Sequence, residues 1–75
     1  MSGEKYSLLY DYYGAFLTKR QREVFELYSE ADLSLSEVAE NLSISRQAVH
    51  VALKKAREEL EKFDKELGLV KELVV

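Results

Sequence analysis

The side chains best suited to molecular recognition lie in one short stretch, from Arg46 to Arg57, which holds four cations and no acid. Helical periodicity predicts an inner face of Ala48, Val49, Ala52, Leu53 and Ala56. The outer face then carries Arg46, Gln47, His50, Val51 and Lys54. Arginine can bond to guanine, glutamine to adenine, and valine can touch a thymine methyl, while Lys54, Lys55 and Arg57 are candidates for phosphate or partner contacts. The same surface could bind structured RNA or an acidic protein.

A second group of cations, Lys19, Arg20 and Arg22, falls at the start of another predicted helix. The helix dipole disfavours positive charge at that end, so these residues call for an explanation. They are either further phosphate contacts or a solvated helix face, and the sequence favours neither.

The sequence contains no recognisable pattern of catalytic or metal-binding residues. The chain has no cysteine and a single histidine, so no metal site is expected. Two of the four serines between residues 34 and 45 are explained as helix caps, and no Gly-rich phosphate loop or nucleotide fingerprint occurs. We therefore expect a protein that is not an enzyme and needs no cofactor. The tyrosines near the N-terminus favour helix packing over base stacking, since only Lys5 lies among them.

The recognition stretch must be positioned by neighbouring helices, and the composition suits an all-α fold. Proline is absent and glycine is scarce, and no segment resembles a strand, so no wing is expected. Apolar spacing and cap residues predict four helices in one domain spanning residues 1–75, at about 4–13, 18–30, 34–42, and 45–67 or beyond. Thr18 with Gln21 and Ser34 with Glu37 fit capping boxes, and Ser45 fits an N-cap.

The third and fourth helices, joined by a short turn, are typical of a helix-turn-helix. Its predicted core consists of Val38, Ala39, Leu42, Ile44, Val49 and Leu53. Ala39 is expected to be small because the two helices cross there. Ser43 stands in a turn that often needs positive φ and usually holds glycine, so either the serine is slightly strained or the turn differs slightly from the usual form.

The fourth helix has an apolar stripe longer than the motif requires. It follows a four-three spacing at Val49, Leu53, Ala56, Leu60, Phe63, Leu67, Val70 and Val74. Gly68 could end the helix, but the unbroken stripe favours its continuation. Leu60, Phe63, Leu67, Val70 and Val74 are expected to pack partly on the first helix and partly on a second copy in a homodimer.

The charge balance weakens a simple DNA-binding interpretation. The net charge is −3 and the sequence pI is about 5.1, whereas DNA-binding domains are usually basic. The acids are concentrated between Glu58 and Glu66, away from the recognition stretch.

No apolar run approaches the roughly 20 residues that cross a bilayer, and the N-terminus does not resemble a secretory signal. We therefore expect a cytoplasmic protein without membrane insertion.

Residues 17–28 and 33–49 resemble region 4 of bacterial sigma factors, a helix-turn-helix that reads promoter DNA. With the preceding Leu9-Tyr-Asp-Tyr-Tyr-Gly-Ala-Phe-Leu17, nearly the whole chain resembles the YlxM family of small bacterial proteins. That resemblance implies a regulatory protein linked to the signal recognition particle through gene neighbourhood, with the particle's GTPase, its RNA, or both as partners. Family members usually extend further at the C-terminus, so the chain looks short or trimmed by comparison. The alternative is a transcriptional regulator that places its second motif helix in the major groove of duplex DNA.

Overall fold

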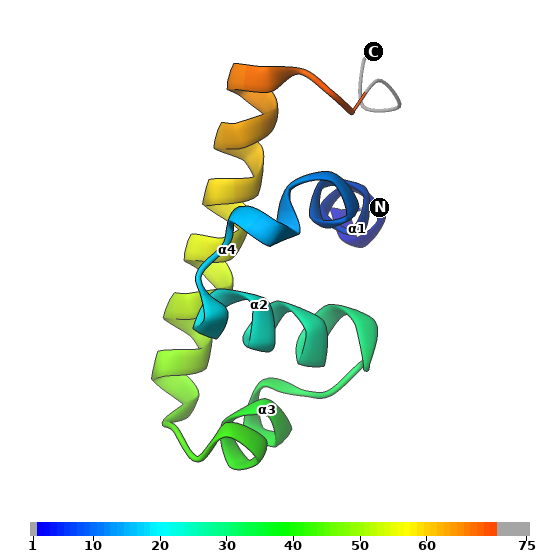
Figure 1. The fold of residues 1–75 in the computed structure, drawn as a ribbon. Coiled ribbons are helices and arrows are strands. Elements are labelled where there is room, and N and C mark those ends of the chain that lie inside the picture. Colours follow the sequence, from blue (N-terminus) through cyan, green and yellow to red (C-terminus); the bar gives the residue numbers. More distant parts are fainter. Residues whose placement is uncertain (1, 71–75) are drawn as a thin grey trace.

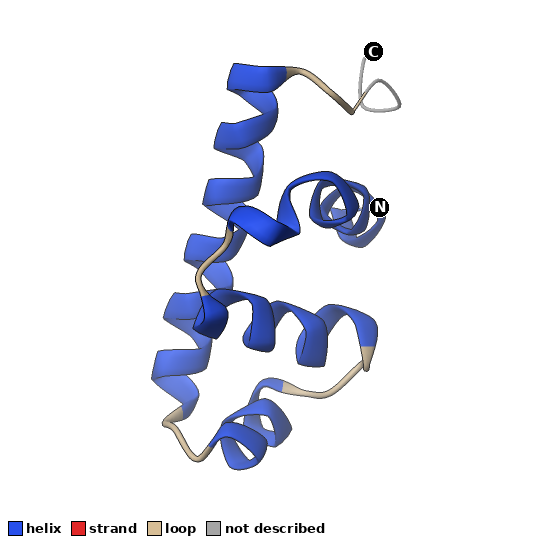
Figure 2. Cartoon of the chain, in the orientation of Figure 1, coloured by secondary structure: helices blue, strands red, loops and turns tan. Residues whose placement is uncertain are grey.

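A long helix forms the spine of the molecule, and three shorter helices stack along one side of it (Figure 1). The computed structural model describes residues 2–70, with side chains from Lys5 onward. Its elements are α1 (Ser2–Tyr13), a 3-10 turn η1 (Gly14–Phe16), α2 (Lys19–Phe25), a π-helical turn η2 (Glu26–Glu30), α3 (Leu35–Leu42) and α4 (Arg46–Leu67). Every regular element in this part of the chain is helical (Figure 2), which confirms the predicted all-α class.

Local capping rules set the beginnings of three helices. The Thr18 hydroxyl accepts the Gln21 backbone N–H at 3.1 Å, and the Gln21 side chain accepts the Thr18 N–H at 3.0 Å. Ser34 and Glu37 make the equivalent pair at 3.1 and 2.8 Å. Ser45 caps α4 by accepting the Ala48 N–H at 3.0 Å. Each cap satisfies an amide that the helix itself cannot pair, and all three predicted caps are confirmed.

The turn between α3 and α4 depends on a serine in a left-handed conformation. Ser43 has φ 57° and ψ 42°, so of the two alternatives the turn keeps its usual positive φ and the serine adopts it. Ile44 then donates its N–H to the Ala39 carbonyl at 3.0 Å, which closes the end of α3. Ala39 is buried at this point, where a larger side chain would separate the two helices.

The core lies where α1, α2 and α3 meet α4. The α4 side of it consists of Val49, Leu53, Ala56 and Leu60, all buried. Opposite them lie Leu9 and Tyr13 of α1, Val24 and Phe25 of α2, and Val38 and Ala39 of α3. Leu42 and Ile44 pack at the edge of this cluster and are half-buried.

The tyrosines of α1 pack largely inside the molecule. Tyr13 is fully buried, and the Tyr10 ring stacks on Phe25 with centroids 4.6 Å apart and planes 15° apart. The Tyr10 hydroxyl also donates to the Glu26 carboxylate. Gly14 permits this arrangement, because a Cβ at that position would lie 2.8 Å from the Tyr10 ring. The packing interpretation of these rings is confirmed, although Tyr12 is exposed.

The predicted continuation of the last helix through Gly68 is wrong. α4 ends at Leu67, and Gly68 adopts φ 64° while its N–H bonds to the Asp64 carbonyl at 2.7 Å. The next amides are also paired, because Leu69 donates to the Tyr13 hydroxyl at 2.9 Å and Val70 donates to the Asp64 carboxylate at 3.2 Å. Tyr13 in turn donates to the same carboxylate at 2.7 Å. The chain reverses here and buries Val70 in its own core.

Candidate nucleic-acid interface

The first three turns of α4 display two rows of side chains that point away from the core. Residues four apart lie above one another on a helix, so one row is Arg46, His50 and Lys54, and the other is Gln47, Val51 and Lys55. All six are exposed. Ala48, predicted to face the core, is also exposed, because the helices that pack on α4 reach only the side carrying Val49, Leu53 and Ala56.

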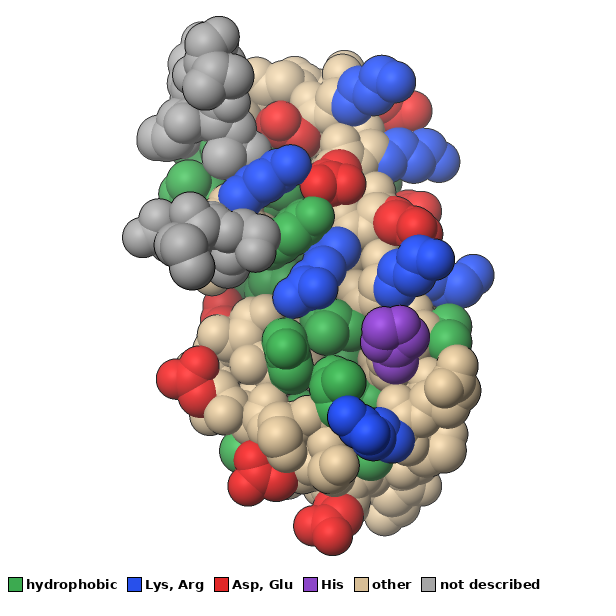
Figure 3. Space-filling model, turned by 180° about the vertical axis from the view of Figure 1, so that it is seen from behind, with side chains coloured by type: hydrophobic (Ala, Val, Ile, Leu, Met, Phe, Trp, Pro, Cys, Tyr) green, Lys and Arg blue, Asp and Glu red, His purple; other side chains and the backbone are tan. Residues whose placement is uncertain are grey.

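The charges of these rows are not compensated by neighbouring acids. Within the described part of the chain, Arg46, His50, Lys54 and Lys55 make no ion pair or side-chain hydrogen bond. Figure 3 shows the histidine with Lys and Arg side chains and hydrophobic side chains near it, while Asp and Glu side chains lie among the cations in the upper half of the view and along its left and lower edges. The rows are therefore a local cationic surface on an acidic protein.

The length of this surface is limited by acids at the next turn. Glu58 and Glu59 follow Lys54 and Lys55 at the same helical spacing, so the cationic rows end there. From Arg46 to Lys55 the helix rises about 14 Å, which suits the few residues that a recognition helix presents to a groove. The arrangement can offer bidentate donors from arginine and glutamine and point charges from lysine.

Arg57 lies at the edge of this surface, beside His50 and Lys54, and packs against two aromatic rings. Its guanidinium lies 5.1 Å from the Tyr6 ring centroid and 5.8 Å from that of Tyr28. The side chain is half-buried, and its Nε atom is buried without a hydrogen-bond partner among the described residues. Sequence spacing missed this position because the two rings come from α1 and η2, far from Arg57 in the chain.

The α2 cations lie apart from the two rows, on the first turn of another helix. Lys19, Arg20 and Arg22 are all exposed. Arg20 approaches Glu23 at 3.9 Å, with side chains 49% and 38% exposed, so this ion pair contributes little to stability. Their placement is compatible with either a phosphate contact or a solvated face.

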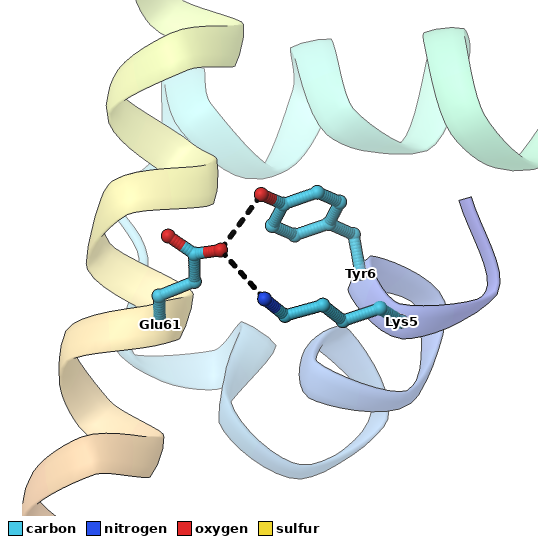
Figure 4. Close-up of polar contacts among 3 residues, drawn as sticks. All are labelled: Lys5, Tyr6 and Glu61. Carbon is cyan, nitrogen blue, oxygen red and sulfur yellow. Dashed lines mark hydrogen bonds and ion pairs between the residues drawn. The ribbon is translucent and has the colours of Figure 1, made fainter. Parts of the chain in front are cut away.

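Part of the acidic half of α4 is neutralised by α1 (Figure 4). Lys5 Nζ donates to Glu61 Oε2 at 3.0 Å, and the Tyr6 hydroxyl donates to the same oxygen at 2.8 Å. These hydrogen bonds lower the pKa of Glu61, and the bond to Glu61 raises the pKa of Lys5. The contact ties α1 to α4 just beyond the cationic rows, so Glu61 does not act as a free charge beside them.

The residues predicted for dimer or tail packing are divided between the core and the surface. Leu60 and Val70 are buried within the chain, which removes them from any dimer seam. Phe63 lies 6.3 Å from the Tyr13 ring and 5.4 Å from the Phe16 ring. Leu67 and Phe16 are 54% and 63% exposed, so an apolar surface remains there. Val74 lies outside the described residues.

The described residues also bear on metal binding and on membrane insertion. Among them, no three His, Cys, Asp or Glu side chains gather in a way that could hold a metal ion. The longest helix, α4, carries too many charges along its length to lie in a bilayer, and no other helix in residues 2–70 could cross one.

Comparison with known proteins gives a consistent family match. The family described as "UPF0122: Putative helix-turn-helix protein, YlxM / p13 like" matches residues 3–75. A UPF0122 protein of Caldanaerobacter subterraneus is 57% identical over 65 residues, covering 87% of this chain and 56% of the relative. One from Desulforamulus reducens is 52% identical over 66 residues (88% and 56%), and one from Symbiobacterium thermophilum is 39% identical over 69 residues (92% and 64%). The chain thus spans little more than half the length of the first two relatives.

Proposed function

The chain belongs to the UPF0122 family of YlxM/p13-like helix-turn-helix proteins, and on that premise we propose that it is a non-enzymatic regulator in the bacterial signal recognition particle pathway. In this proposal it acts in the cytoplasm and binds the particle's RNA through the exposed rows of α4. The particle's GTPase is a second partner, whose activity the protein modulates. The family resemblance supports the pathway, and the geometry of α4 supports the contact with nucleic acid.

The observation that carries this proposal is that the two cationic rows have no paired acids among the described residues, although the protein as a whole is acidic. A protein with net charge −3 is repelled by a phosphate backbone over most of its surface. Arg46, His50 and Lys54 form a local exception, since no described acid pairs with them. The rows are therefore a favoured side for nucleic acid to approach, alongside the smaller cluster of exposed cations at Lys19, Arg20 and Arg22 on α2.

A second candidate function, reading duplex DNA, is favoured by where the polar side chains stand on the helix. Arg46, Gln47 and His50 occupy the first turns of the second motif helix, the part that contacts base edges in helix-turn-helix proteins. Val51, 42% exposed, could contact a thymine methyl group. In this alternative the same rows enter a major groove, and the regulated process is transcription.

Titration of labelled signal recognition particle RNA and of duplex DNA with the full chain, over a salt series, separates the two functions. Binding of the RNA with a dependence on Lys54 supports the proposal, and specific duplex binding with a steep salt dependence supports the alternative. The GTPase is tested separately by its GTP hydrolysis rate with and without the chain. An unchanged rate would remove the GTPase from the proposal.

A matched pair of lysine substitutions on α4 locates the contact. Lys54→Gln removes a charge from the rows, whereas Lys62→Gln removes a charge that is also exposed, two turns further along the same helix. We expect K54Q to weaken RNA binding and to reduce the salt slope by about one phosphate contact, and K62Q to change neither. Equal effects of the two substitutions would contradict a contact at the rows.

A further inference from the structure

A groove lies on the side of the molecule where α1 faces the loop before α3. Its volume is about 1000 Å³. Its apolar lining comes from Leu8 of α1, Tyr28 of η2 and Leu33 of the loop, all half-buried and packed against the core. None of the six side chains of the α4 rows lines it. The groove is therefore a second surface, formed by different residues.

The charge of this groove is opposite to that of the α4 rows. Asp11, Asp32 and Glu37 line it and are exposed, and none of them pairs with a cation in the described part of the chain. Arg57 is the single cation of its lining, and this guanidinium lies over the Tyr28 ring. Three carboxylates against one guanidinium repel phosphate groups and attract cationic side chains.

We propose that this groove binds a basic amphipathic helix of a partner protein. An apolar lining between helices, with charges around it, is the setting in which a helix lays its apolar side chains into a groove. Leucine-like anchors at helical spacing would contact Leu8, Tyr28 and Leu33, while lysine or arginine side chains on the flanks would reach Asp11, Asp32 and Glu37.

The charge argument also distinguishes this partner from other occupants. Nucleic acid is disfavoured by the three carboxylates. A second copy of the chain is less suitable, because it carries a net charge of −3 itself. The groove and the α4 rows attract ligands of opposite sign, so the protein can hold a nucleic acid and a basic protein segment at the same time. This inference does not depend on which nucleic acid the rows bind.

A synthetic helix of about 18 residues, or five turns, tests the proposal, with leucine along one face and lysine at the other positions. Binding of this labelled peptide to the full chain is followed by fluorescence anisotropy, and a peptide with glutamate in place of lysine is the matched probe. We expect the lysine peptide to bind and the glutamate peptide not to bind. Equal binding of both, or of neither, would overturn the proposal.

Two matched serine substitutions locate the binding. Ser29→Arg places a bulky cation in the groove lining, and Ser36→Arg places the same side chain at an exposed position of α3 outside it. We expect S29R to weaken peptide binding at least about tenfold and S36R to change it by less than about twofold, because only S29R adds steric and charge repulsion to the groove. Binding of nucleic acid by S29R should remain unchanged. Equal effects of S29R and S36R on the peptide would overturn the proposal.

A milder pair of substitutions keeps the test valid if S29R does not fold. Asp11→Asn removes a carboxylate of the groove, and Glu40→Gln removes an exposed carboxylate elsewhere on the protein. Loss of one exposed charge contact should weaken binding about two- to fivefold for D11N alone. When the lysine peptide is added to the unsubstituted chain, the changes in backbone amide chemical shift should centre on Leu8 and Leu33. Changes centred on the exposed Phe16 and Leu67 would overturn the proposal. Sedimentation showing a dimer that S29R dissociates would assign the groove to a second copy instead.

Discussion

Replacing Gly68 by alanine tests the account of how α4 ends. Gly68 has φ 64°, and a Cβ at this position would meet nothing within 4 Å, so the cost of G68A is conformational rather than steric. A left-handed conformation costs a residue with a Cβ about 1–2 kcal/mol. The variant could avoid that cost by extending the helix, since alanine is a better helix former than glycine by about 1 kcal/mol.

The contacts after Gly68 decide between these two outcomes. Extension of the helix would expose Val70, whose burial stabilises the protein by about 1.5–3 kcal/mol. It would also break the hydrogen bonds from Leu69 to Tyr13 and from Val70 to Asp64, each contributing about 0.5–1.5 kcal/mol or more. These losses exceed the cost of the left-handed alanine. We therefore expect G68A to keep the turn and to bear the strain.

The measurement is urea unfolding of the full chain followed by circular dichroism. We expect the free energy of unfolding to fall by about 1–2 kcal/mol, a large change for 75 residues at about 0.05–0.15 kcal/mol each. The control is Gly68→Asn, which should lose less because asparagine adopts the left-handed conformation more readily. Unchanged or increased stability of G68A, together with loss of hydrogen-exchange protection at Leu69 and Val70, would refute the reasoning.

Four further predictions follow from other contacts. Tyr13→Phe should abolish hydrogen-exchange protection of the Leu69 amide, whereas Tyr12→Phe, at an exposed ring, should not. Burial raises the pKa values of Tyr10 and Tyr13, and the Glu61 hydrogen bond raises the pKa of Tyr6. These tyrosines therefore add to the free energy of unfolding below about pH 10, the usual tyrosine pKa, and this contribution is lost as the pH rises further. Absorbance at the tyrosinate band and circular dichroism, measured in parallel, check this alkaline loss. Gly14→Ala should lower the free energy of unfolding by about 1–3 kcal/mol, because its Cβ would overlap the Tyr10 ring. We also propose that Phe16 and Leu67 support a homodimer, which sedimentation should detect and Leu67→Lys should dissociate; a monomeric full chain at tens of micromolar would contradict it.

The sequence predicted the starts of α2, α3 and α4 well, because each of these depends on residues three apart, whereas α1, which has no such pair, begins at Ser2 and not at the expected residue 4. Thr18, Ser34 and Ser45 pair with amides on the first turn of their own helix, so no distant contact is needed to place them. A local argument also reduced the turn at Ser43 to two alternatives, a serine with positive φ or a different turn, and the structure has the first. Exposure of Arg46, Gln47, His50 and Lys54 followed from helical spacing once the apolar face of α4 was known.

The errors arose where residues distant in the chain decide the outcome. Apolar spacing continued through Gly68, but it carries no information about the Tyr13 hydroxyl that binds the Leu69 amide. Ala48 has the same side chain as the half-buried Ala52, and only the reach of the packed helices leaves Ala48 exposed. The packing of Arg57 on the rings of Tyr6 and Tyr28 was likewise missed, because these rings come from distant segments of the chain.

By itself, the sequence determined the all-α class, the helix-turn-helix and the cationic face of α4, because caps and apolar periodicity act within a few residues. Only the tertiary structure decided where α4 ends, which part of its apolar stripe is already covered, and that an acidic groove accompanies the cationic rows. Each of these depends on α1, which folds back onto α4 and contributes Tyr6, Leu8, Asp11 and Tyr13. Contacts between such distant segments follow from how the helices pack, and no local pattern in the chain encodes them.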